Sequence, residues 1–207
     1  MKKTLTLLAC LVIAGTGFYG CKKGEGDPAL SMHTRKGRLT GDWDISAGTY
    51  SKTDTDPSGT DVLTTTWSGT SVTQVYSSGG TSSTSIGTGS YKMSIVKDGT
   101  WTSTQQITWT GTPSFIENST TSGTWNWTSG VGETKNKSQI VMRTLSSQST
   151  FGTATSIATY TLDNAPATIY NISQLKNKEI IFHNEGTSLM GTTTSSTKED
   201  YTFTQGK

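Results

Sequence analysis

Apolar and polar residues alternate along much of this chain, starting just after Gly41. Trp43, Ile45 and Ala47 alternate with polar neighbours, which is the period-two pattern of a strand with one face in water. The same pattern recurs in short runs that are separated by turn residues. Further strands are predicted over residues 62–67, 72–76, 91–97, 101–109, 124–128, 139–145, 157–162, 169–172, 179–183 and 201–204.

The clearest hairpin is centred on Asp98-Gly99, a strong two-residue turn signal between two alternating runs. Residues 77–89 contain mostly Ser, Thr and Gly, and this composition predicts a mobile, low-complexity loop. Residues 28–38 are expected to form a short helical or irregular lead-in segment. Its apolar residues would cover one end of the fold: Ala29, Leu30 and Met32.

Many short strands with turns between them, and no long helical stretch, predict an all-β domain. We expect an antiparallel up-and-down barrel of about eight to ten strands, with a β-sandwich as the alternative. Ser and Thr make up about a third of the chain, and apolar residues only 30%. The core must therefore use the large aromatic side chains among the six Trp, seven Tyr and five Phe.

The first twenty residues have the pattern of a bacterial lipoprotein signal peptide. Lys2 and Lys3 precede a mostly apolar run over residues 5–18, which is shorter than the ~20 residues that a membrane-spanning helix needs. Gly20 and Cys21 follow, and this junction resembles a lipobox, in which the cysteine is acylated and becomes the mature N-terminus. An ordinary signal peptide that ends near a cysteine is the alternative.

Cysteine usage favours lipid attachment at Cys21. The other cysteine, Cys10, lies in the segment that would be removed, so Cys21 would otherwise be an unpaired thiol in an oxidising compartment. Residues 1–20 are then the signal peptide, 21–37 the lipidated cysteine with a flexible tether, and 38–207 the barrel domain. Two acyl chains give a stable anchor. No Asp follows Cys21 directly, so we expect an outer-membrane location in the cell envelope.

Charge argues against two classes of partner. The chain has 17 Lys and Arg and 15 Asp and Glu, and the loss of Lys2 and Lys3 with the signal peptide makes these numbers equal. No block of basic residues is present. Nucleic acid and anionic lipid surfaces are therefore not expected as partners of the domain.

The polar residues predict no catalytic or metal site. His33 and His183 are the only histidines and are far apart, so neither a metal cluster nor a nucleophilic triad is expected. Asp42 and Asp44 are interpreted as solvent-facing strand residues. The acidic segment over residues 54–61 lacks a calcium-loop spacing and is interpreted as a solvated loop. We therefore expect no enzyme activity, no metal and no cofactor.

The aromatic residues are the remaining candidates for a site: Tyr91, Trp101, Trp109, Trp125 and Trp127. For each of them a place in the core is the favoured interpretation, because aliphatic residues are scarce. The ligand-binding prediction is placed on Tyr91, Trp101 and Trp109. An enclosed pocket lined by these three would favour a ligand carrier, whereas a flat exposed row would favour a glycan-binding surface.

The segment Leu-Thr-Gly-Asp-Trp-Asp-Ile over residues 39–45 resembles the first-strand Gly-x-Trp motif of lipocalins. The resemblance continues through short motifs at 98–101, 123–125, 170–180 and 201–203. This succession looks like the lipocalin-like domain of small secreted lipoproteins of Gram-negative bacteria, most of them of unknown function, and covers most of residues 38–205. The resemblance implies that Trp43 closes the floor of a barrel. The arginine near the end of the barrel and the C-terminal helix of true lipocalins have no counterpart in this sequence.

These observations together predict a lipid-anchored, non-enzymatic, lipocalin-like protein of the cell envelope. Its partners would be the membrane, through the acyl chains on Cys21, and a small apolar or amphipathic ligand held in the barrel. The alternative is a surface lipoprotein with an accessory role in glycan binding or adhesion.

Overall fold

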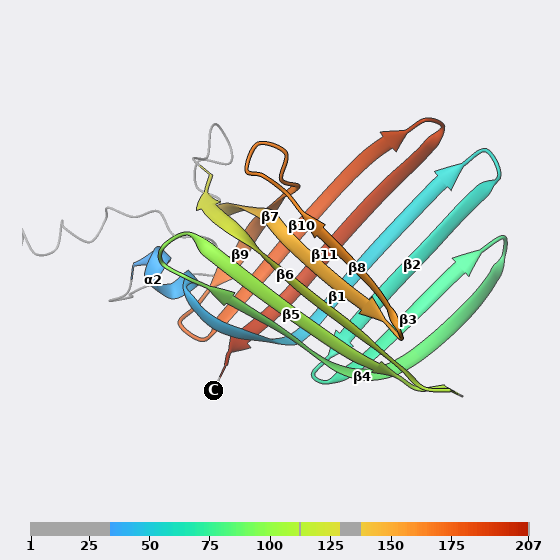
Figure 1. Ribbon diagram of the computed structural model, residues 1–207, viewed down its shortest axis with the longest axis horizontal. Helices are drawn as coiled ribbons and strands as arrows, with labels where there is room; N and C mark the ends of the chain where they lie inside the picture. The colour runs from blue at the N-terminus through green and yellow to red at the C-terminus, as the bar shows by residue number, and fades with distance from the viewer. Residues whose placement is uncertain (1–33, 112, 129–137, 207) are drawn as a thin grey trace, which may run out of the picture.

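The computed structural model describes residues 34–111, 113–128 and 138–206. The predicted signal peptide, Cys21 and the apolar residues of the lead-in segment lie outside these ranges. The described chain has one short helix, α2 (Arg35–Leu39), and an eleven-stranded antiparallel sheet (Figure 1). The strands are β1 (Gly41–Asp56), β2 (Gly59–Ser68), β3 (Ser71–Ser78), β4 (Thr81–Ile95), β5 (Thr100–Trp109), β6 (Phe115–Trp127), β7 (Ser138–Phe151), β8 (Ala154–Thr159), β9 (Ala167–Leu175), β10 (Glu179–Met190) and β11 (Thr193–Gln205).

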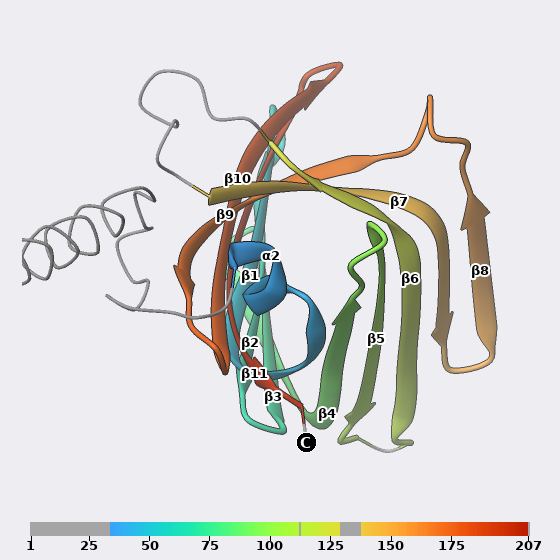
Figure 2. The same ribbon diagram turned by 90° about the vertical axis from the view of Figure 1, so that its left-hand side faces the viewer.

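Ten of these strands close into an antiparallel barrel, which confirms the fold class predicted from the alternating pattern. The ring is completed by β6 and β7, which pair from Glu117 opposite Phe151 to Trp127 opposite Ile140. Strand β8 pairs with the C-terminal half of β7, from Ser146 to Phe151, and lies at the periphery, beside the ring (Figure 2). The β-sandwich alternative is therefore not adopted.

The barrel is narrower at the end that carries α2. There, β1 pairs directly with β4, from Gly41 opposite Ile95 to Asp44 opposite Lys92. Beyond Ala47, β1 pairs with β2 instead, and the first half of β4 pairs with β3. The β2–β3 hairpin is thus inserted only toward the other end, where the ring gains two strands. Because barrel diameter grows with strand number, that end is wider.

The helix α2 closes the narrow end. Thr34 caps the helix by accepting a hydrogen bond from the backbone N–H of Gly37 at 3.0 Å. Arg38 is buried and donates from Nη1 to the carbonyl oxygen of Leu175 at 2.6 Å, which ties the helix to β9. Trp43 donates from Nε1 to the carbonyl oxygen of Leu39 at 3.0 Å and is 1% exposed. No helix in the described part of the chain has the length and apolarity needed to cross a bilayer.

Large apolar side chains alternate into the barrel, and the many threonines cover its outside. Strand β5 shows the pattern: Trp101, Ser103, Ile107 and Trp109 are buried, while the threonines between them are exposed. β-Branched threonine suits the pleated, solvated face of a strand. Much of the Ser/Thr-rich composition therefore lies on the wall's outer surface. The buried apolar core comprises Leu39, Trp43, Ile45, Trp67, Val72, Met93, Ile95, Trp101, Ile107, Trp109, Trp125, Ile140, Met142, Ile172, Leu175, Ile180, Phe182 and Phe203.

One segment was predicted wrongly. Residues 77–89 are not a loop: the turn is confined to Gly79 and Gly80, with φ of +55° and +82°, and β4 begins at Thr81. Ser and Thr in this segment pair in continuous register with β3, from Thr81 opposite Ser78 to Thr88 opposite Ser71. Strand β3 pairs with this part of β4 along its length, and β5 joins on the other side from Gly87 onward. Backbone pairing therefore holds the segment although it has few apolar side chains.

Several strand boundaries also differ from the predicted ones. β10 and β11 continue beyond the predicted 179–183 and 201–204, to form a long hairpin from Glu179 opposite Thr204 to Met190 opposite Thr193. β8 ends at Thr159 rather than at residue 162. The hairpin tips joining β1 to β2, β3 to β4 and β10 to β11 lie at the end away from α2 (Figure 1). The tips that join β1 to β2 and β3 to β4 are polar, and the β10–β11 tip exposes Leu189 and Met190 next to each other. None of the three tips shows the alternation on which the prediction depended.

Candidate functional site

The barrel lumen contains two adjoining cavities. The first, which we call the aromatic cavity, has a volume of about 180 Å³. It is lined by Tyr91, Met93, Trp101, Ser103, Thr121, Met142, Thr144, Thr168, Tyr170, Phe182, Tyr201 and Phe203. The second, the acidic cavity, has a volume of about 350 Å³ and lies toward the wide end. It is lined by Tyr50, Leu63, Thr65, Trp67, Gln74, Tyr91, Gln105, Ile107, Glu117, Glu199 and Tyr201.

Tyr91 and Tyr201 form the partition between the two cavities, since both residues line both of them. Their rings meet edge to face, with centroids 5.8 Å apart and planes at 86°. The Tyr91 ring also meets Phe203 at 5.3 Å and Trp67 at 6.4 Å. Burial, with a smaller contribution from the charge of Glu199, raises the pKa of Tyr91 to about 12. The phenol therefore stays neutral at physiological pH.

Glu199 brings a carboxylate into this aromatic surrounding. It lies on β11 opposite Tyr50 of β1, and its Oε2 atom is buried without a hydrogen-bond partner among the residues the structure describes. Burial raises the pKa of the Glu199 carboxyl, and a hydrogen bond from Tyr170 partly opposes that shift. Burial, with the charge of Glu199, in turn raises the pKa of Tyr50, Tyr170 and Tyr201.

Glu117 supplies the acidic cavity with a second carboxylate. It lies on β6 and lines the acidic cavity. Its Oε2 accepts a hydrogen bond from Nε1 of Trp109 at 3.0 Å. Trp109 thus holds the Glu117 side chain in place from the neighbouring strand.

Cationic side chains do not balance these carboxylates at the cavity surface. Within the described ranges, no Lys, Arg or His lines either cavity. Lys52 lies two residues along β1 from Tyr50, on the same face of the strand. Its Nζ is held by Oδ2 of Asp54 at 2.7 Å. The acidic cavity therefore has a local excess of negative charge.

The predicted ligand-binding residues are only partly brought together. Tyr91 and Trp101 line the aromatic cavity. Trp109 is 2% exposed and lines neither cavity, so its contact with the site passes through Glu117. Trp125 and Trp127 pack edge to face at 6.1 Å near the narrow end, where Lys36 lies 5.8 Å from the Trp125 ring. These five aromatic residues do not form a flat exposed row.

Sequence reasoning missed both carboxylates. The signal was present in the alternation, because Glu117 has the same parity as Trp125 on β6, and Glu199 the same parity as Tyr201 on β11. Each lies beyond the strand boundary that the apolar pattern predicted. The inward-facing positions of each strand therefore extend beyond the segment that the apolar pattern predicted.

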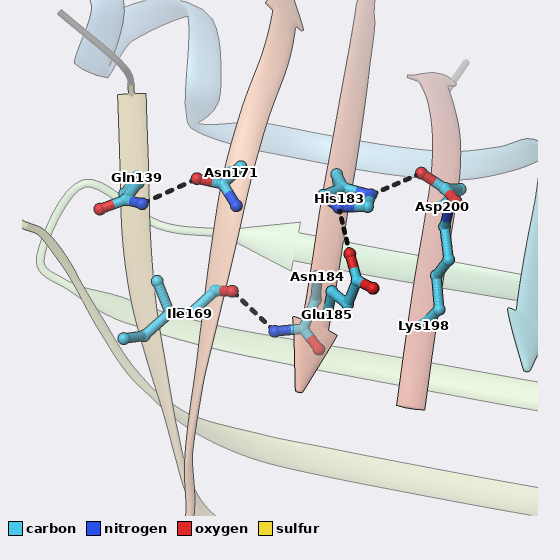
Figure 3. A network of polar contacts seen from close by, with 8 residues as sticks. All are labelled: Gln139, Ile169, Asn171, His183, Asn184, Glu185, Lys198 and Asp200. Carbon is cyan, nitrogen blue, oxygen red and sulfur yellow. Dashed lines mark hydrogen bonds and ion pairs between the residues drawn. The ribbon is translucent and has the colours of Figure 1, made fainter. Parts of the chain in front are cut away.

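His183 lies in a polar network on the outer wall (Figure 3). Its Nδ1 is 2.7 Å from Oδ1 of Asp200, and its Nε2 is 3.8 Å from Oε2 of Glu185. In the same row across the sheet, Gln139 donates from Nε2 to Oδ1 of Asn171 at 2.7 Å. The His183 side chain is 30% exposed, in keeping with its interpretation as a surface residue. Within the described part of the chain, no group of three or more His, Cys, Asp or Glu is arranged to hold a metal ion.

Acidic residues near the two ends of β1 also have local partners. Asp44 is 3.8 Å from Nζ of Lys92 on the outer face. Asp56 accepts hydrogen bonds from the backbone N–H groups of Ser58 and Gly59, at 2.7 and 3.2 Å, and so closes the β1–β2 turn. These contacts account for both residues without a bound ion.

Comparison with known proteins places no relative beside this chain. No family model matches it, and no curated protein and no solved structure match it either.

The raised pKa of Glu199 predicts how stability depends on pH. The folded state holds this proton more tightly than the unfolded state does, so the free energy of unfolding falls as pH rises from the ordinary carboxyl range through the raised pKa. Glu199→Gln should remove this fall and stabilise the protein at pH 7 by roughly 1 kcal/mol. Urea unfolding at pH 4 and pH 7 measures it.

The control is Asp200→Asn, which removes the same charge one residue along β11, on the outer face. The Asp200→Asn variant should still lose stability between pH 4 and pH 7, because Glu199 is unchanged. A Glu199→Gln variant that is less stable than wild type at pH 7 would contradict the assignment of an unfavourable buried charge.

Proposed function

We propose that this chain is a lipid-anchored, non-enzymatic protein of the cell envelope, located at the outer membrane, whose lipocalin-like barrel holds a small ligand in its lumen. The observation that carries the proposal is the pair of adjoining cavities inside a closed barrel. The acidic cavity, at about 350 Å³, falls within the range of ~300–1,000 Å³ that is common for small-molecule sites.

The shape of the barrel supports ligand carriage. Its narrow end is closed by α2 and Trp43, whereas the cavities extend toward the end with the additional strands. A third hollow lies in the wall between β9 and β10, and it shares Thr168 with the aromatic cavity. It forms where β10 continues past its last pairing with β9, His183 opposite Asn171. This hollow in the wall is therefore the place where we propose that a ligand enters, away from the closed narrow end.

The alternative, a surface lipoprotein with an accessory role in glycan binding or adhesion, has less support. It would place the aromatic residues in an exposed row. Tyr91 and Trp101 line an internal cavity, and Trp109 is buried beside it. Their placement favours a ligand inside the barrel over a flat glycan platform.

Ligand carriage is tested by native mass spectrometry of the protein purified from its own envelope. The expected result is additional mass above that of the acylated chain, and this additional mass should be lost on unfolding. Thr121→Phe, which fills the aromatic cavity from β6, should abolish it. Thr120→Phe adds the same ring one residue away, on the exposed face, and should not. An apo mass, with no shift from a panel of lipids and glycans, would overturn ligand carriage.

The anchor is tested separately, because Cys21 lies outside the described residues. Cys21→Ser should move the protein from the membrane fraction to the soluble fraction, since it removes the site of both acyl chains. Cys10→Ser changes a residue of the segment that is cleaved and should leave the protein in the membrane fraction. If Cys21→Ser stays membrane-bound, the lipobox interpretation is wrong.

A further inference from the structure

We propose that the lumen selects a small organic cation, whose ammonium group occupies the acidic cavity against Glu199 and Glu117. This inference rests on the proposed ligand-binding function and adds the chemical class of the ligand. It follows from the charge, the hydrogen bonding and the aromatic surface of one cavity.

The first argument is charge. Glu199 and Glu117 both line the acidic cavity, and no Lys, Arg or His among the described residues does so. Lys52, on the same face of β1, is held by Asp54. An anionic ligand would therefore meet two carboxylates with no compensating cation, whereas a cation would neutralise an existing excess of negative charge.

The second argument is an unsatisfied acceptor. Oε2 of Glu199 is buried and has no hydrogen-bond partner in the described part of the chain, although buried polar groups are nearly always paired. An ammonium N–H would supply that partner as a charge-assisted hydrogen bond. The Glu117 carboxylate already accepts from Trp109, which orients it and leaves its second oxygen available.

The third argument is the aromatic surface. Tyr50, Tyr91, Tyr201 and Trp67 line the same cavity. The faces of such rings carry partial negative charge and attract cations. Burial keeps the Tyr91 phenol neutral. The cation would therefore be attracted to the face of a neutral ring and not to a tyrosinate. Aromatic rings around a carboxylate suit an organic ammonium better than a metal ion, which would need several oxygen ligands.

The aromatic cavity gives the ligand room for an apolar body. It adjoins the acidic cavity across Tyr91 and Tyr201, and Met93, Phe182 and Phe203 contribute to its lining. A ligand with an amine at one end and an apolar group at the other would match both cavities at once. This arrangement narrows the small ligand of the proposed function to a cationic amphiphile.

The test compares matched ligands that differ only in charge. Isothermal titration calorimetry uses the full mature lipoprotein in nanodiscs, with empty nanodiscs as the blank for partition into lipid. The probes are three sets: hexylamine, hexanol and heptanoate; 2-phenylethylamine, 2-phenylethanol and 3-phenylpropionate; tryptamine, tryptophol and indole-3-propionate. In at least one set the amine should bind at least tenfold more tightly than the alcohol, and the carboxylate should bind most weakly.

Substitutions locate the ammonium group. Glu199→Gln and Glu117→Gln should each weaken amine binding roughly ten- to a hundredfold, the range expected for a lost charge-assisted hydrogen bond, and leave alcohol binding unchanged. Asp200→Asn, next to Glu199 in the chain but on the outer face, should leave amine binding unchanged. Equal loss in all three variants would overturn the assignment to the lumen.

The outcomes separate this inference from the proposed function. Equal affinity for amines and alcohols, or tighter binding of carboxylates, would overturn cation selection and leave ligand carriage standing. Binding of none of the nine probes would overturn the cation proposal. Native mass spectrometry of the protein purified from its own envelope then tests ligand carriage independently.

Discussion

Replacing Gly123 with alanine is expected to lower the free energy of unfolding by about 3 kcal/mol, the cost of forcing an additional carbon into a packed interior. Gly123 lies on β6, immediately after a register shift in the pairing with β7 that closes the barrel. A Cβ at this position would overlap the carbonyl oxygen of Arg143 and lie 2.9 Å from its carbonyl carbon. Backbone atoms cannot move aside as a flexible side chain can.

Trp101 makes this site even less tolerant of an added side chain. Its Nε1 donates to the carbonyl oxygens of Thr124 and Arg143, at 3.1 and 3.3 Å. The same Nε1 would lie 3.0 Å from the new Cβ. Moving β7 away from β6 to admit the methyl group would therefore break these bonds as well as the ladder that closes the ring.

Urea unfolding followed by tryptophan fluorescence measures the effect of Gly123→Ala. The matched control is Gly186→Ala on β10, where the nearest atom to a Cβ is Oγ1 of Thr197 at 3.7 Å, an ordinary contact distance. The control should change the free energy of unfolding by less than about 0.5 kcal/mol. Equal stability of the two variants would show that β6 and β7 do not approach as closely as described.

Trp43→Ala should lower the free energy of unfolding by about 3–5 kcal/mol, as for other large aromatic residues removed from a core. Trp43 is 1% exposed at the narrow end, and its indole links the first strand to α2 through the carbonyl oxygen of Leu39. Its loss leaves a cavity where the ring has fewest strands. Since domains are typically stable by only ~5–15 kcal/mol, this change removes a large share of the total.

Trp43→Phe separates packing from hydrogen bonding. It retains an aromatic ring and loses the Nε1 donor, so we expect a smaller cost of about 1–2 kcal/mol. Thermal unfolding of both variants by circular dichroism gives the comparison. If the alanine variant cost no more than the phenylalanine variant, Trp43 would not be filling the floor of the barrel.

The alternating pattern was sufficient to predict the barrel, because large side chains mark the inward face at the narrow end. Trp43, Trp101 and Phe203 each begin or end a run that the structure places in a strand. The wide end was harder, because its strands are built from Ser and Thr. In β4, residues from Thr81 onward pair through backbone groups, and nothing in their side chains distinguishes them from a loop.

The site could be predicted only in part, for a related reason. Tyr91 and Trp101 stand out as aromatic residues at strand positions. Glu199 is significant because β11 pairs with β1 and places it opposite Tyr50, and Glu117 because β6 closes against β7. These pairings join segments that are distant in the chain, so a local pattern does not reveal which side chains share the lumen.

The way in which the β2–β3 hairpin is inserted makes this barrel modular. The strands that flank it, β1 and β4, are already hydrogen-bonded neighbours at the narrow end, so the ring is complete there without the hairpin. The two strands of the hairpin widen the far end of the barrel, and the direct pairing of β1 with β4 at the narrow end does not depend on them. Changes confined to this one contiguous stretch of sequence would therefore alter the width of the wide end for a larger or smaller ligand.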